Sequence, residues 1–367
     1  MSIEILMIAI LTSLATSVVG VFLVLRKLSM ISDAISHTIL LGIVIAYYFV
    51  GDLHSPFLLL GATLMGVFTV YLIEVILKVK HVNEGAAIGI VFTMLFSIAV
   101  IIINTQYRNV HLDIHHVLLG NLEFTIFNRT TIGPFTLPTS LIVMGSVLIL
   151  NLTLLGVFYK EIKLVSFDYA LASVLGFMPL LVHYIMMTLV SLTAVAAFDA
   201  VGAILVIALM IGPPITALFY TKTLLKTILI TMLIAVMNTI VGYQLSYLFD
   251  VTISGMIATV ILLSFMISLV FAPKKGLISR GFNTLKQQQE VMYITFIEHV
   301  QNHQHTEDAV NELSYDSIHE HLGWNKSYMS KLINKALKEG MIKLQRDKVI
   351  CLTQKGLQYH NNLNFNE

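Results

Sequence analysis

Hydrophobic residues occur in long runs over the first three-quarters of the chain, with short polar connections between them. A helical run of about 20 apolar residues crosses the hydrocarbon core of a bilayer, which is roughly 30 Å thick. We therefore predict an all-α polytopic membrane protein with about nine transmembrane helices. Two short runs, 33–50 and 201–220, are candidates for broken or partial helices. The predicted spans cover residues 3–25, 33–50, 57–77, 86–104, 139–159, 177–197, 201–220, 226–248 and 253–272.

The composition excludes an ordinary soluble protein. Of the 367 residues, 57% are hydrophobic and 12% are charged, whereas about 25% of the residues of a soluble globular domain are charged. The single cysteine, Cys351, excludes a disulfide framework and a cysteine-rich zinc site. The first span follows Met1 without the basic segment of a secretory signal, so we expect it to remain in the membrane.

Lysine and arginine residues occupy alternate connections between the predicted spans. Because cytoplasmic connections carry an excess of these residues, we predict that the N-terminus lies outside the cell and the C-terminus inside. The other connections contain only Arg108 and Arg129, both in the long loop 105–138. The basic connections hold Arg26 and Lys27, Lys78 and Lys80, Lys160 and Lys163, Lys222 and Lys226, and Lys274, Lys275 and Arg280.

Three ionisable residues interrupt the apolar spans: Asp33, His37 and Asp199. A charged side chain within a span costs at least about 2–3 kcal/mol on insertion scales, so such residues are candidates for function. Asp33 and His37 are four residues apart, which places them on one face of a helix with Cβ atoms about 5–6 Å apart. The structural alternative is that Asp33 caps a helix that starts there and that His37 bonds to a neighbour.

These three side chains suit a divalent metal ion. First-row metals accept carboxylate and imidazole ligands, and the oxygen-rich balance of two carboxylates and one imidazole favours manganese. Downstream of Asp199, Pro213 and Pro214 lack the backbone N–H groups of two helical hydrogen bonds, so we predict that they break or end the helix. Broken helices at membrane depth line cavities or lie buried in protein.

A second group of candidate ligands lies in the outer loop, within the sequence HLDIHH. It consists of His111, Asp113, His115 and His116. We interpret this group as a candidate outer site that passes metal to the pathway. The alternative is a solvated or docking face, and the residue types alone favour that alternative.

Three segments carry a resemblance to a known family. RKLSMISDAISHTILLGIVIAYY, residues 26–48, resembles the signature after the first span of the metal-type ABC transporter permeases for manganese, zinc and iron. VSFDYALASVLGF, residues 165–177, is similar to a cytoplasmic segment of that family, and AVGAILVIALMIGPPITA, residues 200–217, matches a later span. The resemblance covers about residues 5–276, with the segments in the right order.

The resemblance implies a permease subunit that imports divalent metal ions across the plasma membrane of a bacterium. It implies a homodimer that binds a separate ABC ATPase subunit and receives metal from an extracellular metal-binding lipoprotein. Asp33 and His37 fall on the Asp-x-x-x-His of the family signature, which implies metal ligands or gate residues. Asp199 stands where manganese-type relatives often have an acid, so manganese is favoured, with zinc or iron as alternatives.

The chain lacks the phosphate-binding loop G-x-x-x-x-G-K-[ST], so a partner must supply nucleotide chemistry. We therefore expect a transporter subunit that is not itself an enzyme and has no permanently bound cofactor apart from the transported metal. The resemblance implies that the cytoplasmic segment 168–176 couples the subunit to the ATPase. Its alternative is an ordinary loop helix that covers its own protein. The coupling candidates are Phe167, Asp168, Leu171, Leu175 and Gly176.

After Pro273 the character of the chain changes, because residues 281–367 contain 9 Lys and Arg and 10 Asp and Glu. We predict a transmembrane permease domain over 1–280 and a small cytoplasmic α+β domain over 281–367. Within 290–360 the sequence predicts a helix, a helix-turn-helix with Gly323 at the turn, a two-stranded wing and a closing helix. This pattern resembles the winged helices of bacterial metal-responsive and other transcriptional regulators.

Nucleic acid is not the favoured partner of this domain. Lys331, Lys335 and Lys338 share one face of the second helix and could meet phosphates, but the net charge of about −1 is unlike that of a nucleic-acid reader. His299 and His303 also share a helix face, which leaves a metal sensor or ordinary surface histidines as alternatives. For the whole chain, the alternatives are a membrane-anchored winged-helix transcriptional sensor and an ATP-independent secondary carrier.

Overall fold

The computed structural model describes residues 3–52, 55–79, 81–106, 122–132, 135–273, 275–306, 308–345 and 348–364. The chain forms two compact units, Met1–Leu277 and Ile278–Glu367.

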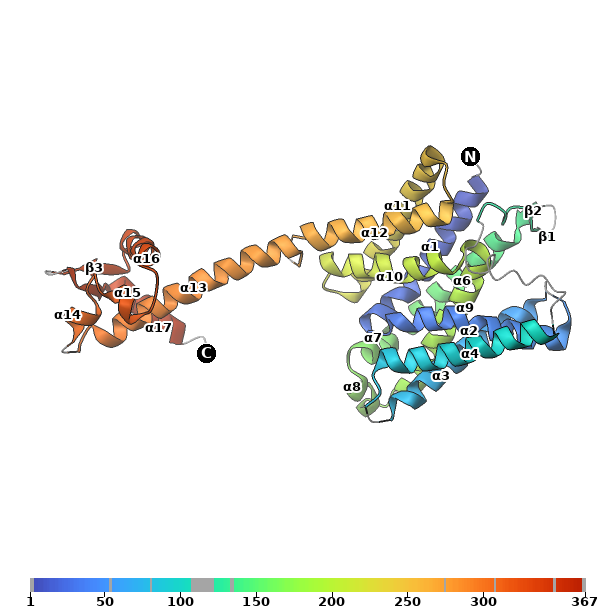
Figure 1. The fold of residues 1–367 in the computed structure, drawn as a ribbon, viewed down its shortest axis with the longest axis horizontal. Helices are drawn as coiled ribbons and strands as arrows, with labels where there is room; N and C mark the ends of the chain where they lie inside the picture. The colour runs from blue at the N-terminus through green and yellow to red at the C-terminus, as the bar shows by residue number, and fades with distance from the viewer. Residues whose placement is uncertain are drawn as a thin grey trace. The chain divides into compact units, whose positions relative to one another are not determined.

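The N-terminal unit is a bundle of helices (Figure 1). Within the described residues, nine helices are long and apolar enough to cross a membrane, which confirms the predicted fold class. The two short predicted spans are unbroken helices, α2 and α10. The nine helices are α1 (Ile3–Leu25), α2 (Ser29–Val50), α3 (Pro56–Leu77), α4 (Glu84–Gln106), α6 (Thr139–Val157), α9 (Pro179–Val201), α10 (Ala203–Tyr220), α11 (Leu224–Phe249) and α12 (Ile253–Phe271).

Shorter elements fill two of the connections between spans. The strands β1 (Arg129–Ile132) and β2 (Phe135–Pro138) form an antiparallel hairpin in which Arg129 pairs with Pro138. Between α6 and α9 lie the short helices α7 (Tyr159–Phe167) and α8 (Tyr169–Val174).

Helix α1 is the centre of the bundle and contacts α6, α9, α10 and α11. The hydroxyl side chains of Thr12, Ser13, Thr16 and Ser17 are fully buried, and they donate to the backbone of the same helix. Thr12 Oγ1 donates to the Ile8 carbonyl at 2.8 Å, and Thr16 Oγ1 donates to the Thr12 carbonyl at 2.7 Å. Because buried polar groups are costly without partners, these bonds allow a hydroxyl-rich helix to pack inside a bundle that lacks water.

Helices α1 and α10 approach so closely at Gly20 that no side chain fits there. A Cβ atom at this position would lie 2.0 Å from the carbonyl oxygen of Met210. Small residues permit such contacts in membranes, where van der Waals packing holds helices together in place of the hydrophobic effect.

The prediction that Pro213 and Pro214 break or end the helix is wrong, because both lie inside the continuous α10. The missing N–H groups leave two carbonyls one turn earlier without their usual donors. One of these carbonyls, that of Met210, faces Gly20. Thr216 Oγ1 donates an additional hydrogen bond to the Gly212 carbonyl at 2.8 Å. Membrane helices tolerate proline because neighbouring helices and local adjustments of the backbone accommodate it.

The helical path is interrupted instead at Gly202, between α9 and α10. Gly202 has φ of 82° and ψ of 160°, a conformation open almost only to glycine. The backbone groups around the break have partners, since Gly202 N–H donates to the Phe198 carbonyl at 3.0 Å and Ser254 Oγ donates to the Val201 carbonyl at 3.0 Å. The break is therefore a defined feature of the bundle.

The C-terminal unit consists of helices around a two-stranded antiparallel sheet. Its core includes Phe296, Ile297, Ile333 and Ile350, all with exposed fractions of 0%. The order of its elements agrees with the helices, hairpin and closing helix predicted for 290–360. The elements are α13 (Leu277–His303), α14 (Ala309–Glu312), α15 (Ile318–His321), α16 (Lys326–Lys338), β3 (Ile342–Leu344), β4 (Ile350–Leu352) and α17 (Gln354–Asn364).

The substitution Gly20→Ala tests the contact between α1 and α10. We expect it to lower the thermal unfolding temperature of the purified chain in detergent, because overpacking typically costs about 1–3 kcal/mol. The control is Gly89→Ala in α4, where an added Cβ meets no atom within 4 Å. Equal unfolding temperatures for the two variants would contradict the close approach.

Candidate functional site

Asp33 lies within helix α2 and does not cap it. The helix begins at Ser29, and its N-cap residue, Leu28, makes no side-chain hydrogen bond. Asp33 is thus one full turn inside the helix, beyond the N-cap position whose side chain bonds to exposed backbone N–H groups. This excludes the capping alternative and leaves the carboxylate free for another role.

The structure brings Asp33 and His37 together. His37 Nε2 lies 3.6 Å from Asp33 Oδ1, and the side chains are 31% and 54% exposed respectively. The imidazole packs against α4, with ring centroids 5.2 Å from Phe92 and 6.1 Å from Phe96. The aromatic rings orient the imidazole while the carboxylate stays accessible, so the pair offers one oxygen and one nitrogen ligand on the same face of α2.

Asp199 is exposed near the C-terminal end of α9, three residues before the break at Gly202. Over the described part of the chain, no group of three or more His, Cys, Asp or Glu side chains is arranged to hold a metal ion. A single chain therefore pairs Asp33 with His37 but does not gather Asp199 with them into one site. The outer candidates His111, Asp113, His115 and His116 lie outside the described residues.

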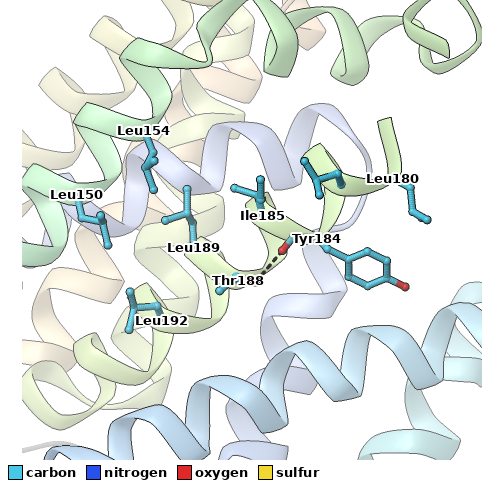
Figure 2. Close-up of a pocket in the computed structure, with 9 residues that line it drawn as sticks. Leu150, Leu154, Leu180, Tyr184, Ile185, Thr188, Leu189 and Leu192 are labelled. Atoms are coloured by element: carbon cyan, nitrogen blue, oxygen red, sulfur yellow. Dashed lines mark hydrogen bonds between the residues drawn. The ribbon is translucent and has the colours of Figure 1, made fainter. Parts of the chain in front are cut away.

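A surface pocket of about 540 Å³ lies between α6 and α9, away from these side chains. Figure 2 shows its lining of leucine and isoleucine side chains, together with Tyr184 and Thr188. The Thr188 hydroxyl is already used, because it donates to the Tyr184 carbonyl at 2.7 Å. This aliphatic lining offers no set of ligands to a metal ion.

The predicted coupling segment forms the short helix α8 and its two ends. Asp168 caps the helix, since its Oδ1 accepts a hydrogen bond from the Leu171 N–H at 2.9 Å. Gly176 follows the helix with φ of 81°, a left-handed conformation typical of glycine after a helix. The two residues therefore define where α8 starts and stops.

Helix α8 presents an apolar surface, which we call the α8 patch: Phe167, Leu171, Val174 and Leu175. These side chains are 63%, 45%, 84% and 59% exposed. Within α8 only Ala172 is buried, so the helix covers little of its own protein. Clustered exposed apolar residues of this kind are typical of a surface that binds another protein or a membrane.

A polar cluster between α3 and α9 was not among the predicted site residues. Glu74 Oε1 lies 2.5 Å from His183 Nε2, and Tyr184 Oη donates to Glu74 Oε2 at 2.9 Å. His183 is 7% exposed. Arg26, at the end of α1, interacts electrostatically with Glu74 and also with Tyr169 of α8. The cluster thus links three spans and extends to the helix that carries the α8 patch.

A weak signal for this cluster was available in the sequence. Glu74 and His183 each stand near the end of an apolar run, where an ionisable residue is costly without a partner. Because Glu74 and His183 are more than a hundred residues apart in the sequence, no local pattern could show that they pair.

Comparison with known proteins places the N-terminal unit in a family. The chain matches the ABC 3 transport family over residues 2–272. It is 38% identical over 357 residues to the zinc transport system membrane protein TroD of Treponema pallidum, which covers 97% of each chain. It is 41% identical over 282 residues to the manganese transport system membrane protein MntD of Bacillus subtilis, which covers 77% of this chain and 95% of MntD.

A solved structure supports the same relationship. PsaBC from Streptococcus pneumoniae, in complex with Fab, matches with a TM-score of 0.62 and 28% sequence identity, over 74% of this chain and 92% of that one. The resemblance found in the sequence is therefore confirmed. The family match ends at residue 272, before the C-terminal unit, whereas the TroD match includes most of that unit. The chain belongs to the ABC 3 transport family, and its relatives TroD and MntD are membrane proteins of metal transport systems.

Proposed function

We propose that the chain is the permease subunit of an ABC importer for divalent metal ions in a bacterial plasma membrane. The observation that carries this proposal is the Asp33–His37 pair, an accessible ligand pair one turn inside a membrane helix of a metal-transporter relative. An acid and an imidazole at such a position are costly. The cost of placing these side chains in a span is offset because their oxygen and nitrogen atoms replace water molecules around a passing cation.

Manganese is the metal that we propose, with zinc or iron as the alternatives. Carboxylate ligands suit manganese, and imidazole is shared by all three metals. Asp199 adds a second carboxylate to the ligands that line the pathway. Because one chain does not gather Asp199 with the Asp33–His37 pair, we propose that the ion meets these ligands in sequence along the pathway of a homodimer.

The energy comes from a separate ABC ATPase subunit that docks on the α8 patch. Exposed apolar side chains support this assignment, together with the cluster around Glu74 that links α8 to α1, α3 and α9. In this proposal, a movement of α8 is transmitted through the Glu74 cluster to α1, α3 and α9. The other partner is an extracellular metal-binding lipoprotein, which delivers metal from the outer side of the membrane.

The C-terminal unit is a cytoplasmic winged-helix domain in this proposal. Its helix order and its antiparallel hairpin support the assignment. We do not assign it to DNA, because its balance of charges is slightly acidic. A membrane-anchored transcriptional sensor would bind operator DNA in a salt-dependent way, and a secondary carrier would transport metal without any ATPase subunit.

Loss of a pathway ligand is expected to abolish metal accumulation. In a strain that lacks this chain, wild type should restore cellular manganese, measured by mass spectrometry, whereas Asp33→Asn or His37→Ala should not. Since loss of even an outer-shell partner costs about 10- to 100-fold in metal affinity, we expect at least a tenfold loss of uptake. The control is Asp250→Asn at the end of α11, where φ of 52° suits asparagine equally well. Full restoration by the variants at equal membrane levels would contradict the site.

A charge in the α8 patch is expected to uncouple the permease from its ATPase. Val174→Glu, at a side chain that is 84% exposed, should leave membrane insertion unchanged but remove co-purification of the ATPase subunit. Two variants serve as controls. Val79→Glu introduces the same charge at an exposed apolar residue after α3, and Leu171→Met changes a residue of the α8 patch but keeps its apolar character. Both controls should retain the ATPase. Co-purification that survives Val174→Glu would contradict docking on this patch.

A further inference from the structure

The C-terminal unit contains a histidine pair that the transport pathway does not use. His299 and His303 lie one turn apart on α13, and their ring centroids are 4.5 Å apart with an interplanar angle of 40°. Residues at this spacing lie on the same face of a helix. Two imidazoles so placed can bind one metal ion, as the two histidines of H-E-x-x-H motifs do.

Glu312, at the end of α14, orients both rings. Its carboxylate contacts Nδ1 of His303, and its backbone forms a hydrogen bond with the side chain of His299. Histidine ligands of metals typically use one ring nitrogen for a carboxylate or a backbone carbonyl, which fixes the tautomer and leaves the other nitrogen for the metal. Glu312 alone thus contacts both histidine side chains, one through its carboxylate and the other through its backbone.

The remaining nitrogen atoms are available to a ligand. Nε2 of His299 is buried and has no hydrogen-bond partner among the residues that the structure describes, although buried polar atoms normally have one. The pair of His303 with Glu312 engages Nδ1, so Nε2 is the remaining atom of that ring as well. The side chains of His303 and Glu312 are 35% and 26% exposed, which leaves a route for an ion from solvent.

We propose that His299 and His303 form a binding site for a divalent transition-metal cation, with Glu312 as the residue that positions both imidazoles. Over the described residues, no group of three or more His, Cys, Asp or Glu side chains is arranged to hold a metal ion, so the proposed site consists of the two imidazoles with water as the remaining ligands. Such a site prefers zinc or cobalt to manganese, because imidazole suits those metals and manganese binds more weakly in the general order of affinities.

The electrostatics of the pair support this assignment. Burial, together with the nearby His303 and His321, lowers the pKa of His299, and this exceeds the opposite influence of Glu312. Metal binding requires the neutral imidazole, and the lowered pKa of His299 favours that form.

The site is tested by metal binding to the untagged full-length chain purified in detergent. Zinc is titrated by calorimetry, and cobalt is titrated by its visible absorption bands. The background carries Asp33→Asn and His37→Gln, together with His111→Gln, His115→Gln and His116→Gln, so that neither the transport pathway nor the outer histidine group contributes to binding. We expect one zinc equivalent that persists in this background and in His305→Gln, and that is lost in His299→Gln/His303→Gln. Manganese should bind at least about tenfold more weakly than zinc.

Two further variants keep the test independent of folding. His303→Gln alters only a partly exposed side chain and should remove the cobalt bands, while circular dichroism confirms an unchanged fold. Glu312→Gln keeps both ligands and should weaken zinc binding by about 10- to 100-fold. Unchanged zinc stoichiometry and affinity in these variants would overturn the site. That result would leave the transport proposal standing, because transport is tested separately with Asp33 and His37.

Discussion

The structure depends on the absence of water from the bilayer core, which requires each polar group of the spans to find its partner within the protein. Helix α1 satisfies its buried hydroxyl groups through its own backbone. Asn151 of α6 donates to Thr193 of α9 at 2.9 Å. These bonds free the helix faces for close packing, of which the contact at Gly20 is an example. An ionisable side chain that still has access to solvent in such a bundle is therefore a functional feature.

Two acid–histidine pairs described in the bundle differ in their exposure and in the distance between acid and histidine. His183 and Glu74 are 7% and 31% exposed, and Tyr184 donates to the second carboxylate oxygen of Glu74. His37 and Asp33 are 31% and 54% exposed, and the carboxylate oxygen lies 3.6 Å from the His37 nitrogen, longer than a hydrogen bond. In the proposed function, the more buried pair joins helices and the more exposed pair exchanges its partner for a passing cation.

The spans could be predicted from the sequence because their length is set by the thickness of the bilayer and their composition by its apolar interior. The Asp33–His37 pair was also predictable, since a spacing of four residues is local to one helix. Two features were not. Helix α10 continues through Pro213 and Pro214 beside a close contact with Gly20 of another helix, and the Glu74–His183 pair joins α3 to α9 across more than a hundred residues. Both features involve neighbouring helices, which a local pattern does not contain.

The most direct test of the central claim is ATP-dependent uptake of radioactive manganese into vesicles that contain this chain with its ATPase subunit and binding lipoprotein. With wild type, uptake should require ATP inside the compartment that holds the ATPase, and it should fall to background for Asp33→Asn. In the same vesicles, Asp33→Asn should still assemble with the ATPase, because the α8 patch is intact. Uptake by Asp33→Asn equal to that of wild type would show that the ion does not pass the Asp33–His37 pair, and would contradict the account.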